Sequence, residues 1–350
     1  MKGWMGKFRA LFLLSSLALI LSGCGKDNLT ALVPKGYGAE SAMDLIILTT
    51  IVMVFVFIIV MIIYTIVLIR FRKKKGQEDI IPKQVEGNKT LETIWTIIPI
   101  LLLLIIAVPT VTATFDLADE TGKEDAINIH VTGNQFWWHF NYEGEEIQTS
   151  QDLYIPVGER VYLDMISSDV IHSFWVPTIA GKMDTNPENE NTMYIEAYEE
   201  GVYWGKCAEL CGPSHSLMDF KVIAVSPEEY DQWVADMQNV DPEEEPQDAV
   251  VQEGKELFEA NNCMSCHAIG SSPAAIGPNL TNFGDRSTIA GFLEPTKENL
   301  VDWIVDPESI KPGNKMTGNY PNVSEEEAES IAEYLMQLQP SEVTPESAGN

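Results

Sequence analysis

The sequence predicts a multidomain membrane protein with a two-helix transmembrane hairpin, a Greek-key β-barrel or sandwich, and a small all-α domain. Two long uncharged apolar runs, at residues 45–69 and 93–115, predict the hairpin. Residues 127–225 alternate apolar with polar residues and are rich in β-branched and aromatic types, which predicts strands. Residues 250–341 contain short amphipathic segments separated by loops, which predicts helices.

Residues 1–23 have the pattern of a secretory signal peptide. Lys2, Lys7 and Arg9 precede a short apolar stretch that ends in Leu-Ser-Gly-Cys24. This ending resembles a bacterial lipobox, in which the signal is removed and Cys24 becomes a lipid-modified N-terminus. The alternative is an uncleaved first membrane helix, although the apolar run is short for crossing a bilayer. Residues 24–44 then form a short outer segment.

Charge predicts the orientation of the hairpin. The chain has 350 residues with 22 Lys plus Arg and 52 Asp plus Glu, a formal net charge of −30 that argues against nucleic-acid binding. The loop at residues 70–92 carries a net +3, so the positive-inside rule places it in the cytoplasm. Cys24 and everything after residue 115 then lie outside, on the side to which the signal peptide also directs the chain. This outer portion, residues 116–350, holds 10 basic and 45 acidic residues.

The outer portion divides into two domains. The first, residues 116–238, has predicted strands at 127–131, 136–142, 160–166, 192–197, 201–206 and 219–225, and a closing helix at 227–237. An acidic linker follows at residues 239–249. The second domain, residues 250–341, has helices at 254–261 and 297–305 and a third that begins at Ser324 with Glu327 as its capping-box partner. Residues 342–350 form a tail.

Soft metal ligands are concentrated between the last two predicted strands of the first domain. Cys207, Cys211, His215 and Met218 lie within twelve residues, and His172 stands at the start of another apolar segment. Thiolate, imidazole and thioether ligands together favour copper. A disulfide between the two cysteines and a structural zinc site remain alternatives. Met218 would be unusual beside zinc, and a disulfide explains neither histidine.

This arrangement resembles the dinuclear CuA site of cytochrome c oxidase subunit II, and the resemblance extends over residues 40–238. It implies a cupredoxin-like Greek-key barrel with two coppers bridged by the Cys207 and Cys211 thiolates. His172, His215 and Met218 would complete the coordination, together with the backbone carbonyl of Glu209. The Glu209 side chain would face the catalytic subunit and help to hold Mg²⁺.

Two further positions follow from the resemblance. In the family, a Glu that matches Glu92 lies at the mouth of a proton path into the catalytic subunit; the alternative is a helix N-terminal residue stabilised by the dipole. Phe136, in Gly-Asn-Gln-Phe-Trp137-Trp138, stands where many members have the Trp that receives electrons from a mobile cytochrome. This departure puts the usual route of electrons into the copper site in doubt, and Trp137 and Trp138 fit packing roles.

The second domain contains the c-type haem attachment motif Cys263-Met-Ser-Cys266-His267. Two thioethers would hold the porphyrin and His267 would bind the iron. A redox dithiol or half of a zinc site is the alternative. Met316 is the expected second axial ligand, whereas Met336 lies within the last helix and is expected in the core. By resemblance to class I cytochromes c, the carbonyl of Pro278 would accept the ring N–H of His267.

These motifs predict an electron-transfer subunit of a caa3-type cytochrome c oxidase in a bacterial plasma membrane. The resemblance implies an external cytochrome c as donor, a haem-copper subunit I that reduces oxygen and pumps protons, and other oxidase subunits as partners. Two alternatives remain open: the CuA subunit of a nitric oxide reductase and a freestanding membrane-anchored shuttle. A quinol-oxidase subunit II is a third, but that branch lacks the copper ligands found here.

Overall fold

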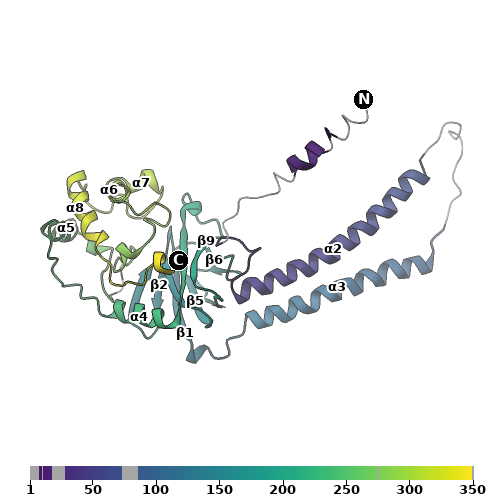
Figure 1. The fold of residues 1–350 in the computed structure, drawn as a ribbon, viewed down its shortest axis with the longest axis horizontal. Helices are drawn as coiled ribbons and strands as arrows, with labels where there is room; N and C mark the ends of the chain where they lie inside the picture. The colour runs from purple at the N-terminus through teal and green to yellow at the C-terminus, as the bar shows by residue number, and fades with distance from the viewer. Residues whose placement is uncertain are drawn as a thin grey trace.

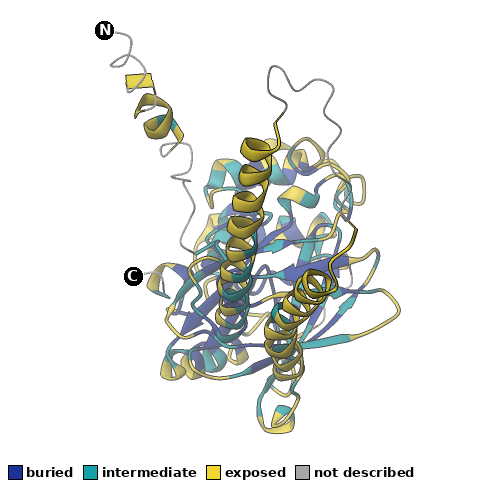
Figure 2. Cartoon of the chain, turned by 90° about the vertical axis from the view of Figure 1, so that its right-hand side faces the viewer, coloured by how far each residue is buried: buried dark blue, intermediate teal, exposed yellow. Residues whose placement is uncertain are grey.

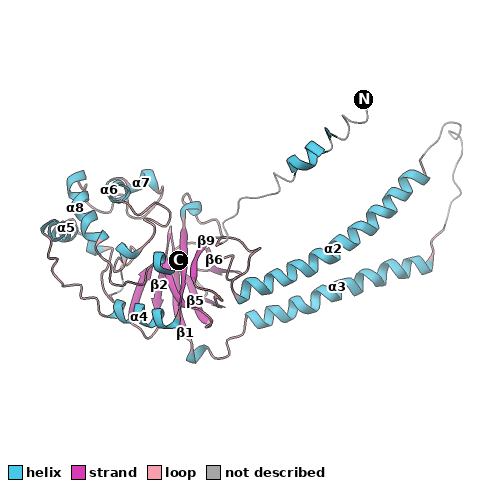
Figure 3. Cartoon of the chain, in the orientation of Figure 1, coloured by secondary structure: helices cyan, strands magenta, loops and turns pink. Residues whose placement is uncertain are grey.

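A long helical hairpin, a β-domain and a helical domain make up the computed structural model (Figure 1). It describes residues 8–9, 11–17, 28–72, 86–272, 274 and 276–348. Cys24, much of the predicted signal peptide and the middle of the predicted cytoplasmic loop lie outside the described residues. Figure 3 shows the strands in the middle, with the helical hairpin on one side of them and most of the remaining helices on the other.

Among the described residues, two helices are long and apolar enough to cross a membrane: α2 (Tyr37–Arg70) and α3 (Lys89–Leu117). Most residues of the hairpin are exposed (Figure 2), and many of these are large apolar residues, as expected of a surface that faces lipid. Both helices extend beyond the predicted apolar runs. The Asn88 side chain caps α3 by accepting hydrogen bonds from the backbone of Thr90 and Leu91, and the first turns of α2 pack on the β-domain.

The start of α2 is fixed to the β-domain by backbone contacts. Ala39 N–H donates to the carbonyl of Ile179 at 3.0 Å, and a Cβ on Gly38 would lie 3.1 Å from the Cα of Ala180. The hairpin therefore leaves the β-domain at a defined point.

Within the described residues, ten strands form two five-stranded sheets that face each other, with strand orders β3-β2-β1-β5-β8 and β4-β10-β9-β6-β7. The strands are β1 (Ile127–Asn134), β2 (Trp137–Tyr142), β3 (Ile147–Ser150), β4 (Asp152–Pro156), β5 (Val161–Ser167), β6 (His172–Trp175), β7 (Lys182–Thr185), β8 (Asn191–Ile195), β9 (Gly201–Cys207) and β10 (Asp219–Val225). Four of these strands, β3, β4, β6 and β7, were not predicted from the sequence. Each has only four or five residues, and β4 is buried throughout, so none of the four shows a clear alternating pattern.

Aromatic side chains fill the space between the sheets. Trp138, Phe174 and Phe220 are fully buried or nearly so and contact one another with ring centroids 4.5–5.6 Å apart. Helix α4 (Pro227–Gln238) closes one end, where Trp233 stacks on Tyr154 at 4.6 Å. The predicted Greek-key sandwich and its closing helix are confirmed.

The second domain is helical, with α5 (Ala249–Ala260), α6 (Lys297–Val305), α7 (Pro307–Ile310) and α8 (Glu325–Met336). The part of the chain that the structure describes also contains four short 3-10 helices: η1 (Lys123–Asp125), η2 (His215–Leu217), η3 (Cys263–Ser265) and η4 (Phe283–Asp285). Helix α5 begins five residues before the predicted start because Asp248 caps it by accepting from the backbone of Val250 and Val251. A Cβ on Gly254 would lie 2.0 Å from the carbonyl oxygen of Ser330, so glycine is needed where α5 crosses α8.

The tail returns to the first domain. Val343 belongs to the core of the β-domain, and α9 (Pro345–Ala348) contacts β9 and β10. Ser341 Oγ donates to the Asp236 carboxylate of α4 at 2.7 Å. The helical domain is therefore tied to the β-domain at its end as well as by the linker.

Buried charges lie where the two outer domains meet. Asp152 of β4, Asp285 of η4 and Arg286 are each more than nine-tenths buried. Burial raises the pKa of Asp285 to about 7 from 3.8, although Arg286 opposes the shift. The folded chain then holds a proton on Asp285 that the unfolded chain has already released at pH 5–6.

We predict that stability falls between about pH 4 and pH 7 through Asp285. The pKa of Asp285 is higher in the folded chain than in the unfolded chain, so the folded chain binds this proton more tightly. Its contribution to stability is therefore fully present below the unfolded pKa and is lost as the pH rises through the folded pKa of about 7. Asp285→Asn should flatten that part of the profile by about 1 kcal/mol or more, measured as the thermal midpoint of the full chain in detergent. Asp184→Asn, at a half-exposed position in β7, is the control; a profile that keeps its slope in Asp285→Asn contradicts the assignment.

Candidate functional site

The loop between β9 and β10 carries most of the candidate metal ligands. The two strands pair in antiparallel fashion with Lys206 opposite Asp219, so residues 207–218 form a loop that leaves and returns at one edge. Cys207 N–H donates to the Met218 carbonyl at 3.3 Å and closes the loop. Both ends of the loop are thereby held by the sheet.

His172 reaches the same place from β6. That strand pairs with β9, with Phe174 opposite Cys207, and the His172 side chain is fully buried. A Cβ on Gly133 of β1 would lie 2.9 Å from the imidazole, so glycine leaves the space that the ring occupies. Two neighbouring strands therefore bring His172 to the cysteine loop.

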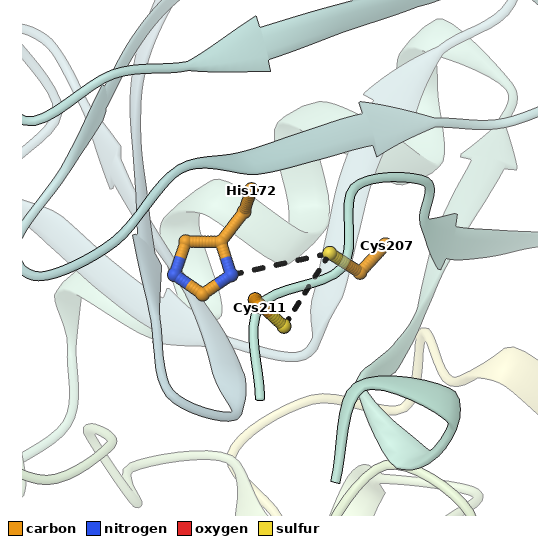
Figure 4. Close-up of side chains that lie close together, drawn as sticks. All are labelled: His172, Cys207 and Cys211. Carbon is orange, nitrogen blue, oxygen red and sulfur yellow. Dashed lines mark hydrogen bonds between the residues drawn. The ribbon is translucent and has the colours of Figure 1, made fainter. Parts of the chain in front are cut away.

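The predicted ligand atoms converge on the two thiols (Figure 4). Cys207 Sγ lies 3.9 Å from Cys211 Sγ and 3.9 Å from His172 Nδ1. Cys211 Sγ lies 3.6 Å from His215 Nδ1 and 3.8 Å from Met218 Sδ. Ligands that share a tetrahedral metal at bond lengths of 2.0–2.3 Å lie about 3.3–3.8 Å apart. The donor set therefore fits metal ions held around a shared pair of sulfurs.

Glu209 contributes its backbone here and not its side chain. The Cys207 thiol donates to the Glu209 carbonyl at 3.2 Å, while the Glu209 side chain is exposed. A disulfide between Cys207 and Cys211 does not fit, because their sulfur atoms are well beyond the S–S bond length of about 2.05 Å. Zinc sites are usually filled by four Cys, His or carboxylate ligands, whereas the thioether of Met218 beside the two thiols favours copper.

The electrostatics of the pair favour binding as thiolates. The contact between the two thiols lowers the pKa of Cys207 and, together with burial, raises that of Cys211, so a metal that bound both sulfurs as thiolates would displace the remaining proton. Burial would lower the pKa of His172, but its hydrogen bonds to Asp169 and Cys207 and the negative charge of both groups together outweigh burial and raise it.

Asp169 orients the buried histidine. His172 Nε2–H donates to Asp169 Oδ1 at 2.8 Å, which leaves Nδ1 facing Cys207. Asp169 Oδ2 accepts from the backbone N–H of Gln135 at 2.8 Å and from Lys315 Nζ at 2.7 Å. Sequence reasoning missed Asp169, although a carboxylate three residues before a ligand histidine is a recognisable signal.

The haem motif lines an apolar cavity in the helical domain. Cys263 and Cys266 lie at its wall together with His267, whose Nδ1–H donates to the Pro278 carbonyl at 2.8 Å. This bond leaves Nε2 as the nitrogen able to bind iron. A Cβ on Gly277 would lie 2.8 Å from the imidazole, so the chain passes the ring closely only because glycine is present. The residues fit a covalently attached haem.

The two candidate methionines lie in different places. Met316 lines the same cavity as His267, whereas Met336 packs on the helical core and lines a separate hollow beside the tail. The cavity also contains Gln135, Phe136 and Trp137 of the β-domain. Its wall therefore comes from both domains.

Three family models match successive parts of the chain. Residues 38–112 match the transmembrane domain of cytochrome c oxidase subunit II, residues 144–225 match its periplasmic domain, and residues 251–339 match cytochrome c. The chain is 51% identical to cytochrome c oxidase subunit 2 of Alkalihalophilus pseudofirmus, over 97% of this chain and 99% of that protein. It belongs to the cytochrome c oxidase subunit II family.

A second relative agrees with this membership. Cytochrome c oxidase subunit 2 of Bacillus subtilis is 46% identical over 95% of this chain and 98% of that protein. The crystal structure of the periplasmic domain of the Bradyrhizobium japonicum oxidase subunit II (CoxB) is 26% identical, covers 31% of this chain and 91% of that domain, and has a TM-score of 0.30. The predicted family, the fold class and the place in an oxidoreductase complex are confirmed.

Family membership supports part of the remaining predictions. The matched domains imply copper and haem c, and they indicate an electron-transfer chain that associates with other oxidase subunits. The two apolar helices and the periplasmic domain fit a membrane protein with domains outside the cytoplasm. The described residues bring together the predicted His172, Cys207, Cys211, His215 and Met218.

We predict that Asp169→Asn lowers copper affinity about 10- to 100-fold, because the substitution weakens the bond that fixes the His172 ring. The measurement is copper retention against a chelator in purified full-length chain. Asp184→Asn, an acid on the neighbouring β7, should behave like the parent chain. Equal retention in all three proteins would show that Asp169 does not support the ligand.

Proposed function

We propose that this chain takes electrons from an external cytochrome c and delivers them to subunit I of a cytochrome c oxidase, where oxygen is reduced to water with proton pumping. When bound, haem c and dinuclear copper supply one-electron carriers. The observation that carries the proposal is the shared wall: Gln135 lines the haem cavity, and its Nε2 donates to the Cys211 carbonyl at 2.5 Å. One side chain thus contacts both candidate sites.

The chain's own residues would have distinct parts. Cys263 and Cys266 would hold the haem covalently, His267 and Met316 would bind its iron, and the Pro278 carbonyl would orient His267. The copper ligands would be His172, Cys207, Glu209 through its carbonyl, Cys211, His215 and Met218. Because rigid strands hold these ligands, their positions would change little between oxidation states.

The face beside the copper loop supports a protein partner. Leu210 is 78% exposed, and Val170 and Ile171, next to His172 in sequence, are also exposed. Exposed apolar residues around a buried metal site are typical of a docking face. We propose subunit I as its occupant, with the exposed Glu209 carboxylate helping to hold Mg²⁺ there.

The proposal extends to the membrane portion. Cys24 would carry lipid after removal of the signal peptide, so the chain would be anchored three times. Glu92 lies in the first turn of α3 and is exposed in the isolated chain, a position open to a neighbouring subunit. We propose that it marks the mouth of a proton path.

The subunits that copurify with this chain test which molecule is the terminal electron acceptor. A partner that reduces nitric oxide and not oxygen would favour the reductase alternative.

We predict two coppers and one covalent haem per chain. Metal analysis, haem staining of the denatured chain and a visible spectrum of the purified chain measure them. His172→Ala should abolish the mixed-valence copper spectrum and leave the haem bands, because the haem cavity uses other residues. His130→Ala, at a half-exposed position on β1, is the matched control. One zinc without copper, or absence of covalent haem, would overturn the proposal.

We also predict that reduction by a basic cytochrome c slows as salt is added. The outer portion has 45 acidic and 10 basic residues, so it should attract a basic donor over a distance that shrinks from about 30 Å at 0.01 M to about 8 Å at 0.15 M ionic strength. Stopped-flow reduction rates across this range test it. A rate independent of ionic strength would show that the charge does not steer the donor.

A further inference from the structure

The loop that carries Met316 lies directly on the copper loop. Ser214 Oγ, in the copper loop, donates to the Pro312 carbonyl at 2.7 Å. Lys315, next to Met316, pairs with Asp169 at 2.7 Å, and Asp169 holds the ring of His172. A residue adjacent to the expected iron ligand is thereby connected to a copper ligand through one carboxylate.

Phe136 lies between these two loops. Its side chain is 2% exposed and belongs to the wall of the haem cavity. A Cβ on Gly212, next to Cys211, would lie 3.0 Å from Phe136 Cζ, and one on Gly313 would lie 3.7 Å from Phe136 Cε2. The ring therefore contacts the copper loop on one side and the haem-ligand loop on the other.

Lys311 fixes this position. It is 3% exposed, and its Nζ donates to the carbonyls of Phe136 in the β-domain and Ala290 in the helical domain, both at 2.7 Å. Burial lowers the pKa of Lys311 to about 7, and either form of the amine can donate both bonds. Burying an amine costs free energy unless it is hydrogen-bonded, and here each domain supplies one of the two acceptors. Both bonds can therefore form only while the domains stay in contact.

The contact continues away from the two loops. Thr149 Oγ1 donates to Asn282 Oδ1 at 3.0 Å in a fully buried bond. Asp152 lies close to Arg286 of the other domain, and both are buried. With the tail packed on β9 and β10, the helical domain is held at several separate points.

We propose that the haem domain is permanently docked on the copper domain, and that Lys311 is a positioning residue that keeps Phe136 in contact with both cofactor loops. This inference rests on the proposed function and deepens it. The docked domain covers Phe136, so an external donor meets the haem domain and does not reach the copper loop by that face.

Chemical labelling of the intact full-length chain tests the docking without any cofactor readout. An amine-acylating reagent followed by mass spectrometry should label the exposed Lys182 readily and leave Lys311 protected. A domain that swings on its linker would expose Lys311, and labelling at a rate close to that of Lys182 would overturn the proposal.

The role of Lys311 is tested with Lys311→Met, which keeps the aliphatic length and removes the donors. Loss of these hydrogen bonds should weaken the docked arrangement about tenfold or more, and electron transfer from flash-reduced haem to copper should slow as Phe136 loses contact with the two loops. Hydrogen exchange of residues 311–316 should rise, with the haem and copper spectra unchanged. Lys297→Met removes a lysine that pairs with Glu333 inside the haem domain and is the matched control.

The outcomes separate the two proposals. An unchanged transfer rate and unchanged exchange in Lys311→Met would overturn the positioning role. If the parent chain lacked copper or haem, the proposed function would fail, and the labelling of Lys311 would still report whether the domains are docked. If Lys311→Met did not fold, protection of Lys311 in the parent chain would decide the docking.

Discussion

The position of β9 between β10 and β6 is the constraint on which the metal site depends. Pairing with β10 holds both ends of the loop 207–218, and pairing with β6 places His172 beside Cys207. Because the ligands come from neighbouring strands of one sheet, their spacing is set by backbone hydrogen bonds and not by side-chain flexibility. The rest of the outer portion is arranged around this edge: Asp169 orients His172, and the haem domain contacts the loop where Ser214 donates to the Pro312 carbonyl.

Much of the fold could be predicted from the sequence because its signals are local. The apolar runs, the alternating strands and the spacing Cys207 to Met218 or Cys263 to His267 each lie within a few tens of residues. The four short strands could not, since four or five residues show too little periodicity. Gln135 and Lys311 could not either, because Gln135 bonds to Cys211 across the β-domain and Lys311 bonds to Phe136 across the boundary between the two domains, contacts between residues that are distant in sequence.

The surroundings of Phe136 explain why this residue departs from the family pattern, in which many members have Trp. By resemblance, the expected aromatic residue at this position receives electrons from a mobile protein and must therefore be reachable. Here the residue is buried between Gly212 and Gly313 and has no surface to offer a mobile partner. A smaller ring without a polar edge suits a position enclosed by two loops, because an indole N–H would need a hydrogen-bond partner there.

The charge distribution supports the same arrangement. Two strongly acidic domains should repel each other, and of the ten basic residues in the outer portion, Lys221, Arg286, Lys311 and Lys315 all lie at the contact between them. Each lies near a carbonyl, hydroxyl or carboxylate oxygen at the contact between the two domains. The cations therefore offset repulsion where the domains touch, and the acidic residues remain on the outer surface, where they can act on a basic donor. The net negative charge of the outer portion thus acts on external partners, whereas the basic residues at the domain contact help to hold the haem domain in place.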